Sequence, residues 1–198
     1  WHRVPCPVLD DEGMHSGVIV CGDLHSDERR AADQLDEWAG FGTTVIVDCR
    51  DEWSDEQFVT RRRPEIAYVH VGVDDHGGQQ PDEWFDQGVD GAVAQISAGG
   101  RALVHCHMGI NRGPSMALAV LLALGWDVVA ALDALLRARP IVGLLYAADA
   151  IDWFGRREGW SIADIADSQA AATDWLERNG IDHAHVARVI RAVRVTGE

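Results

Sequence analysis

The chain has 198 residues, of which 47% are hydrophobic, and its 32 acidic side chains outnumber 17 basic ones for a formal net charge of −15. A chain of this length and apolar content can bury the core of one ordinary domain, with some sequence left over. The acidic surface argues against nucleic acid or anionic membranes as partners, and no apolar run reaches the roughly 18 residues that a membrane span needs.

Strands and helices are expected to alternate along most of the chain. In chain order, the pattern predicts a strand at 18–20, a helix at 28–39, strands at 43–47 and 67–73, a helix at 84–96, a strand at 102–105, and helices at 114–124 and 128–138. This alternation predicts an α/β fold with a central four- or five-stranded mixed or parallel sheet flanked by helices. The arginine run at 61–63 is typical of a solvated loop.

The last part of the chain follows a different pattern. From about Ser161 onward the sequence is helical only, and Asn179-Gly180 would join two helices into a hairpin. We therefore expect a main domain at 1–158 and a helical C-terminal extension at 159–198 that packs on or beside it.

Cysteine usage bears on metal binding and on the cellular compartment. The four cysteines are Cys6, Cys21, Cys49 and Cys106, and no two of them form a C-x-x-C pair. A zinc site is therefore not expected, and the sequence indicates no other metal or cofactor. No basic region followed by an apolar one opens the chain, so we expect a cytoplasmic protein with reduced thiols.

The most informative segment lies between a predicted strand and a predicted helix. Residues 104–115 read Val-His-Cys-His-Met-Gly-Ile-Asn-Arg-Gly-Pro-Ser. A loop that runs from a strand into a helix N-terminus can curl so that its backbone N–H groups converge on an anion. Gly109 permits the turn, and Pro114 suits the first turn of the helix. The segment therefore predicts a cradle for a tetrahedral dianion.

The residue types in this segment point to nucleophilic chemistry on phosphate. The field of the cradle favours the thiolate of Cys106, which is the nucleophilic form. Arg112 can bind two phosphate oxygens with its planar guanidinium and offset charge in the transition state. His105 precedes the nucleophile, and we expect it to orient the loop. The residues expected to surround the phosphate are His107, Met108, Gly109, Ile110, Asn111 and Arg112.

A leaving group also needs a proton, so a general acid should lie elsewhere in the chain. Asp74 and Asp75 follow the predicted strand at 67–73, and Gly77-Gly78 could let their loop move over a substrate. Turns favour aspartate in any case, so the pair could also be structural. We expect one of the two to be the acid, with the other in a supporting role.

Residues 104–115 resemble the His-Cys-x5-Arg signature of the dual-specificity branch of the protein tyrosine phosphatases. Arg139-Pro140 is similar to a further landmark of that family, and the resemblance covers roughly 16–153. It implies that 1–158 is a phosphatase-like catalytic domain that forms a phosphocysteine intermediate and needs no metal. It also implies an acid at the end of a strand, a few residues past an aromatic. Tyr68 and the strand end favour Asp75.

One position departs from the family pattern. The family usually has serine or threonine directly after the arginine, where the hydroxyl stabilises the leaving thiolate. This chain has Gly113, and Ser115 lies two residues further on. We expect the missing hydroxyl to affect hydrolysis of the phosphocysteine more than its formation.

Cys49 ends a predicted strand where some lipid-phosphatase relatives carry a second cysteine. We expect either a reversible disulfide between Cys49 and Cys106 or a buried core thiol at this position. Mass spectrometry after mild peroxide treatment distinguishes the two.

The leading hypothesis is a phosphatase for phosphotyrosine, with phosphoserine and phosphothreonine as further substrates. Its partner is a phosphorylated protein or a small phosphomonoester, and the oligomeric state is left open. A phosphoinositide or small-molecule phosphatase is an alternative, although His107 is the one basic residue inside the loop. An RNA 5′-triphosphatase fits Gly-x-Asn-Arg at 109–112, but not the net charge of −15. Gly113 motivates a phosphate-binding pseudophosphatase.

Overall fold

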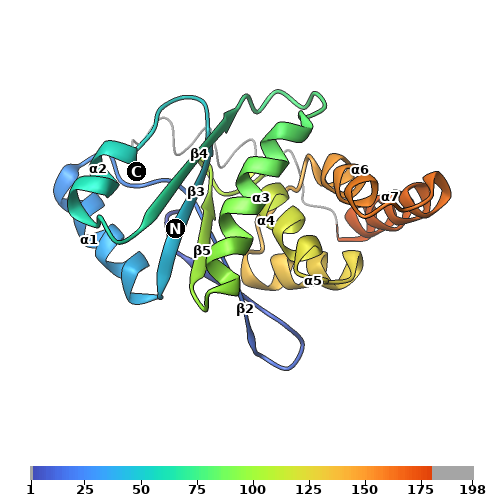
Figure 1. Cartoon of the computed structure of the whole chain (residues 1–198), viewed down its shortest axis with the longest axis horizontal. Coiled ribbons are helices and arrows are strands. Elements are labelled where there is room, and N and C mark those ends of the chain that lie inside the picture. The colour runs from blue at the N-terminus through green and yellow to red at the C-terminus, as the bar shows by residue number, and fades with distance from the viewer. Residues whose placement is uncertain (1, 180–198) are drawn as a thin grey trace.

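A five-stranded mixed sheet forms the centre of the molecule (Figure 1). The computed structural model describes residues 2–179. Strand order is β1-β2-β5-β3-β4; β1 is antiparallel to β2, and the other pairs are parallel. The strands are β1 (Cys6–Leu9), β2 (His15–Cys21), β3 (Thr43–Arg50), β4 (Ala67–Val73) and β5 (Arg101–His105). The four parallel strands therefore present their carboxyl ends at one edge of the sheet.

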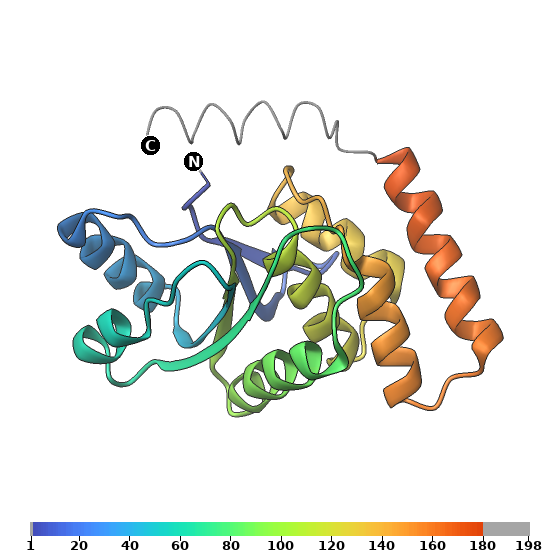
Figure 2. The same ribbon diagram turned by 90° about the horizontal axis from the view of Figure 1, so that it is seen from above.

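Helices cover both faces of this sheet (Figures 1 and 2). On one side lie α1 (Glu28–Gly40) and α2 (Glu56–Arg62). The other side holds α3 (Asp82–Ser97), α4 (Arg112–Ala123), α5 (Val128–Ala138), α6 (Ala147–Arg157) and, outermost, α7 (Ile162–Arg178). No helix within 2–179 has both the length and the apolar character needed to cross a membrane.

Alternation along the strands divides the core in two. Ile19, Ile46 and Leu103 pack with Leu35 and Trp38 on the side of α1 and α2. The intervening strand residues face α3 and α4 and belong to the larger cluster: Val18, Val20, Val45, Val47, Ala102 and Val104. Both faces of the central strands are therefore buried, which explains their β-branched, uniformly apolar sequences.

The expected fold class is confirmed, and three elements were missing from the sequence prediction. Pro5 and Pro7 obscured β1, which tolerates proline because it is an edge strand. The expected loop at 61–63 was wrong, since Arg61 and Arg62 form the last turn of α2. Helix α6 was missed because no side chain caps its N-terminus. The second helix of the expected C-terminal hairpin lies outside the described residues.

Trp175 is the largest of three buried side chains that hold helix α7 to the main domain, with Ile165 and Ala172. Trp175 is buried, and its indole Nε1 donates to Asp133 on α5 at 2.6 Å. A capping box between Ser161 and Asp164 fixes the start of the helix. The expected boundary between 158 and 159 stays a prediction, but the contacts of Trp175 indicate that α7 shares the core.

We expect Trp175→Ala to lower the free energy of unfolding by about 3–5 kcal/mol, the usual cost of truncating a buried tryptophan. Urea denaturation followed by circular dichroism measures this change. Ile162→Ala is the matched control, because Ile162 lies on the same helix and is 88% exposed. An unchanged unfolding midpoint for Trp175→Ala would show that α7 folds separately from the main domain.

Candidate active site

A pocket of about 230 Å³ lies at the carboxyl edge of the parallel strands. Cys106 directly follows β5, while Glu52 and Asp75 lie two residues past the ends of β3 and β4, so the ends of three strands meet at one place. The lining residues are Glu52, Asp75, Cys106, His107, Met108, Ile110, Asn111 and Arg112. The structure therefore brings together Cys106, Arg112 and Asp75, the three residues that the sequence analysis selected.

Hydrogen bonds to its backbone carbonyl groups hold the loop between Cys106 and Arg112 open. All five carbonyls of residues 107–111 accept hydrogen bonds from donors in other segments or in the helix that follows. These bonds are Asp23 N to His107 O at 3.1 Å, Arg139 Nη2 to Met108 O at 2.9 Å, Arg139 Nε to Gly109 O at 2.7 Å, Gly143 N to Ile110 O at 2.7 Å and Ser115 N to Asn111 O at 2.9 Å.

The outward carbonyls direct the amide groups inward. Across a planar trans peptide, the C=O of one residue and the N–H of the next point in opposite directions. The N–H groups of residues 108–112 therefore face into the loop, and none of them donates to an acceptor within residues 2–179. Five convergent donors at the N-terminus of α4 form a binding site for an anion with several oxygens.

Two glycines allow the loop this shape. Gly109 has φ +62°, and a Cβ there would collide with the carbonyl oxygen of Cys21. A Cβ at Gly113 would lie 3.0 Å from the carbonyl carbon of His105 and 3.1 Å from the nitrogen of Cys106. Gly109 is therefore required by the backbone, while a side chain at position 113 needs a shift of a few tenths of an ångström.

Arg112 is fixed along one edge and free along the other. Its Nη1 and Nη2 donate to the two carboxylate oxygens of Glu52 at 2.8 and 2.7 Å, and Nη1 also reaches Val73 O at 2.8 Å. Its Nε is buried without a hydrogen bond, 3.8 Å from Asp75 Oδ2. The edge formed by Nε and the second Nη2 hydrogen therefore remains available to an oxyanion.

Opposite charges stabilise the contact between Glu52 and Arg112. Burial opposes ionisation of Glu52, but the hydrogen bonds and charge of Arg112 lower the pKa of Glu52 to about 2. The carboxylate is thus negative throughout the neutral range. Glu52 was missed by the sequence analysis, although its place two residues past the end of a parallel strand is the signal that could have found it.

Asp75 is held at the pocket mouth by a tyrosine from a distant segment. Tyr146 donates its hydroxyl to Asp75 Oδ1 at 2.9 Å and accepts from the N–H of Gly77 at 3.2 Å. Burial and the nearby carboxylate raise the pKa of Tyr146 to about 12, so the hydroxyl stays a donor. Asn111 Nδ2 lies 3.4 Å from the other oxygen of Asp75.

Asp74, the neighbour of Asp75, enters the site through its backbone. Its carbonyl lies 3.5 Å from the Tyr146 hydroxyl, while its side chain makes no hydrogen bond among the described residues. The geometry therefore favours Asp75 over Asp74 as the carboxyl group that faces Cys106 and Arg112.

His105 lies beneath the loop rather than in the pocket. Its buried ring is 3.6 Å from Asp48 Oδ1 and packs against Trp38 with the ring centroids 5.6 Å apart. Burial lowers the pKa of His105, which keeps the imidazole neutral. The ring therefore contacts the core and the buried carboxylate, and the expectation that His105 orients the loop stays a prediction.

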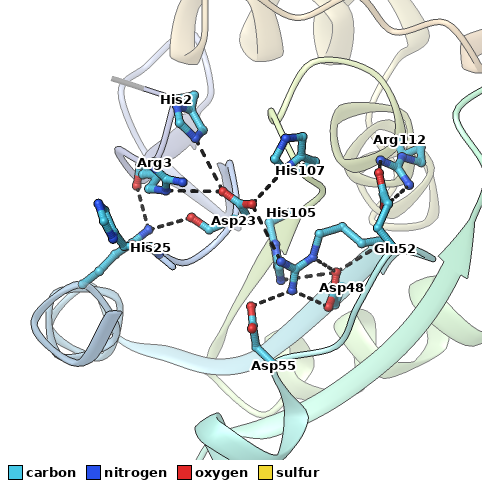
Figure 3. A network of polar contacts seen from close by, with 12 residues as sticks. His2, Arg3, Asp23, His25, Asp48, Glu52, Asp55, His105, His107 and Arg112 are labelled. Atoms are coloured by element: carbon cyan, nitrogen blue, oxygen red, sulfur yellow. Dashed lines mark hydrogen bonds and ion pairs between the residues drawn. The ribbon is translucent and has the colours of Figure 1, made fainter. Parts of the chain in front are cut away.

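Asp48 belongs to a buried ionic network that supports the loop from below (Figure 3). Arg50 donates to both oxygens of Asp48 and to Asp55 at 2.6–2.8 Å, and Tyr68 donates to Asp48. Burial opposes the charge of Asp48, but His105 and Arg50 lower its pKa to about 2. The network thus fixes β3 and β5 relative to each other just before Glu52 and Cys106.

The remaining predicted residues are placed as follows. All four cysteines are free thiols. Cys49 is buried. Burial, and to a smaller extent the nearby Cys106, raises the pKa of the Cys49 thiol well above its ordinary value. The hydroxyl of Ser115 accepts from the N–H of Tyr146 at 3.2 Å, so it anchors that segment. Within 2–179, no three histidine, cysteine or acidic side chains are grouped in a way that could hold a metal ion.

Comparisons with solved structures support the fold. Human DUSP28 is 20% identical with a TM-score of 0.59 over 80% of this chain and 99% of its own. PTPMT1 in complex with PI(5)P is 17% identical with a TM-score of 0.55 over 70% and 90%. The human tyrosine phosphatase-like serine/threonine/tyrosine-interacting protein is 14% identical with a TM-score of 0.58 over 76% and 95%. At these identities the likeness shows the fold.

Sequence comparison supplies the family. No curated protein sequence matches the chain. The family model described as the dual specificity phosphatase catalytic domain matches residues 27–144, more than half of the chain. The chain therefore belongs to the dual specificity phosphatase catalytic domain family of cysteine-based phosphatases.

Proposed function

We propose that the chain hydrolyses phosphomonoesters of the phosphotyrosine type, with phosphoserine and phosphothreonine as further substrates, through a phosphocysteine on Cys106. The observation that carries this proposal is the loop with five inward N–H groups, which surrounds the thiol and the free edge of Arg112. We propose that the protein acts in the cytoplasm, because four free thiols fit a reducing compartment.

The proposed reaction has two steps. In the first, the thiolate of Cys106 attacks phosphorus, the bond to the ester oxygen breaks, and Asp75 gives its proton to that oxygen. In the second, Asp75 takes a proton from water as the water oxygen attacks the phosphocysteine, which releases phosphate and restores the thiolate. The loop N–H groups and Arg112 bind the three phosphate oxygens in both steps.

The charge around the pocket favours substrates with little further negative charge. Asp51, Glu52 and Asp75 are all exposed in part at the mouth, with side-chain exposures of 45%, 38% and 32%. Carboxylates at the mouth of the pocket repel any additional phosphate groups on a substrate. This supports a phosphomonoester on a protein or small molecule over a polyphosphoinositide or an RNA 5′-triphosphate. The disulfide between Cys49 and Cys106 stays a prediction.

Substitution of the proposed acid should change the dependence on the leaving group. We expect Asp75→Asn to lower kcat by about 10²–10⁴ for an alkyl phosphate, whose leaving oxygen needs a proton, and far less for a nitrophenyl phosphate. Cys106→Ser should abolish turnover of both. Steady-state assays on a series of aryl and alkyl phosphates measure this difference.

Asp74→Asn is the matched comparison for this experiment, because it changes the adjacent carboxylate to the same amide. Equal losses in Asp74→Asn and Asp75→Asn, or the same loss for every leaving group, would contradict the assignment. Tight binding of phosphate without turnover by the wild type would instead support the pseudophosphatase alternative.

Glu52 should be required to present Arg112. We expect Glu52→Gln to lower kcat/KM by about ten- to a hundredfold, because an amide cannot accept both guanidinium donors and leaves a buried charge unpaired. Asp51→Asn serves for comparison, since Asp51 touches Nη1 alone at 3.2 Å. A gain in activity for Glu52→Gln would mean that Glu52 competes with the substrate phosphate for Arg112.

A further inference from the structure

His107 is held at two points by a single residue from outside the loop. Asp23 follows β2, and its N–H donates to the carbonyl of His107 at 3.1 Å. Its carboxylate Oδ2 also lies 2.8 Å from Nδ1 of the His107 ring. One residue therefore fixes both the first outward carbonyl of the loop and the orientation of its imidazole.

The state of Asp23 determines which ring nitrogen of His107 is free. Burial opposes the charge of Asp23, but hydrogen bonds from His107 and His2 and the charge of Arg3 hold its pKa well below the ordinary range. An ionised carboxylate only accepts hydrogen bonds, so Nδ1 of His107 carries the proton. Nε2 is consequently the nitrogen left for a ligand.

His107 lies at the wall of the pocket, where a ligand can reach its ring. The residue lines the pocket of Cys106 and Arg112, and it also lines a neighbouring cleft of about 420 Å³. Its ring meets Trp53 edge-on at 5.3 Å between centroids. His107 is also the one basic side chain in the loop between the thiol and the arginine. In a chain of net charge −15, a fixed imidazole at this wall is a significant local feature.

The first residues of the described chain lie beside Asp23 and contact its carboxylate (Figure 3). Arg3 Nε lies 3.4 Å from Asp23 Oδ1. The carbonyl of His2 accepts from Gly22 N and from Arg139 Nη2, each at 2.8 Å, and the same Nη2 binds the loop at Met108. A Cβ at Gly22 would collide with the His2 carbonyl. The segment is thus built into the base of the site.

We propose that Asp23 is a positioning residue for the phosphatase reaction, which it serves by holding His107 with Nδ1 protonated and Nε2 turned to the substrate. This inference rests on the proposed function. It also lies outside the family match, because Asp23 and the segment at residues 2–3 precede residue 27. In the phosphate complex the ring carries both protons, so that Nδ1–H donates to Asp23 while Nε2–H donates to an oxygen of the bound phosphate.

The test compares Asp23→Asn with Gln34→Ala, which disturbs the same turn without touching His107. Gln34 Nε2 donates to the carbonyl of Asp23 at 3.0 Å and its oxygen accepts from His25 N at 3.0 Å. For each variant we would measure the Kd of tungstate, kcat and KM for an aryl phosphate, and the ¹⁵N shifts of the His107 ring. These shifts, recorded with and without tungstate, report directly which ring nitrogens carry a proton.

We expect Asp23→Asn to raise the tungstate Kd and the KM by about tenfold and to lower the fraction of doubly protonated His107 ring in the tungstate complex, because a neutral amide replaces a charged acceptor. Gln34→Ala should stay within about twofold. In a His107→Gln background, Asp23→Asn should add no further loss. These three results together would support positioning through the ring.

Unchanged ring shifts with an unchanged tungstate Kd in Asp23→Asn would overturn the proposal. Equal losses in Asp23→Asn and Gln34→Ala would also overturn it, since they would mean a purely structural role. If the wild type binds tungstate but hydrolyses no ester, the proposed function fails separately. The tungstate and ring-shift measurements still decide the role of Asp23 in that case.

Discussion

The site depends on one constraint, the outward hydrogen bonding of five consecutive carbonyls in the loop after β5. Peptide geometry converts these bonds into inward N–H groups. Arg139 donates two of the five hydrogen bonds and is itself buried. It also donates to the carbonyl of His2, so helix α5, which precedes it, and the N-terminal segment both help to hold the loop. A buried guanidinium that satisfies backbone carbonyls replaces the water that these groups would otherwise need.

Charge is the second constraint, and it acts against the overall composition of the chain. An acidic protein can hold a phosphate only where local donors outweigh the surface field. Here the N–H groups and the free edge of Arg112 provide the donors, while Glu52 keeps the guanidinium in place. The buried pair of Asp48 and Arg50 lies below, where its cost in desolvation is offset by mutual hydrogen bonds.

The sequence predicted the residues that share a local motif, and it missed those that reach the site through long-range contacts. Cys106 and Arg112 are found by spacing within one loop, and Asp75 by its place at a strand end. Tyr146 lies some 70 residues from the loop of Asp75 in the chain, and only the fold brings its hydroxyl there. No local pattern marks it. Asp23 was missed for the same reason, since its partner His107 lies on another strand end.

The central strands and helices were predictable because burial on both faces leaves a continuous β-branched signal and helical periodicity survives beside it. The edge strand β1 and helix α6 lack such signals, since Pro7 interrupts the first and tertiary packing rather than a cap determines the start of the second. Packing of Ala150 and Ile151 against the core, rather than local propensity, explains α6.

The most direct test of this account is to quench the wild type in acid during turnover of an aryl phosphate and to locate the phosphate by peptide mass spectrometry. We expect a phosphoryl group on Cys106, and its accumulation if Gly113 slows the second step. Turnover at the wild-type rate with no phosphate on Cys106, and undiminished activity in Cys106→Ser, would contradict it.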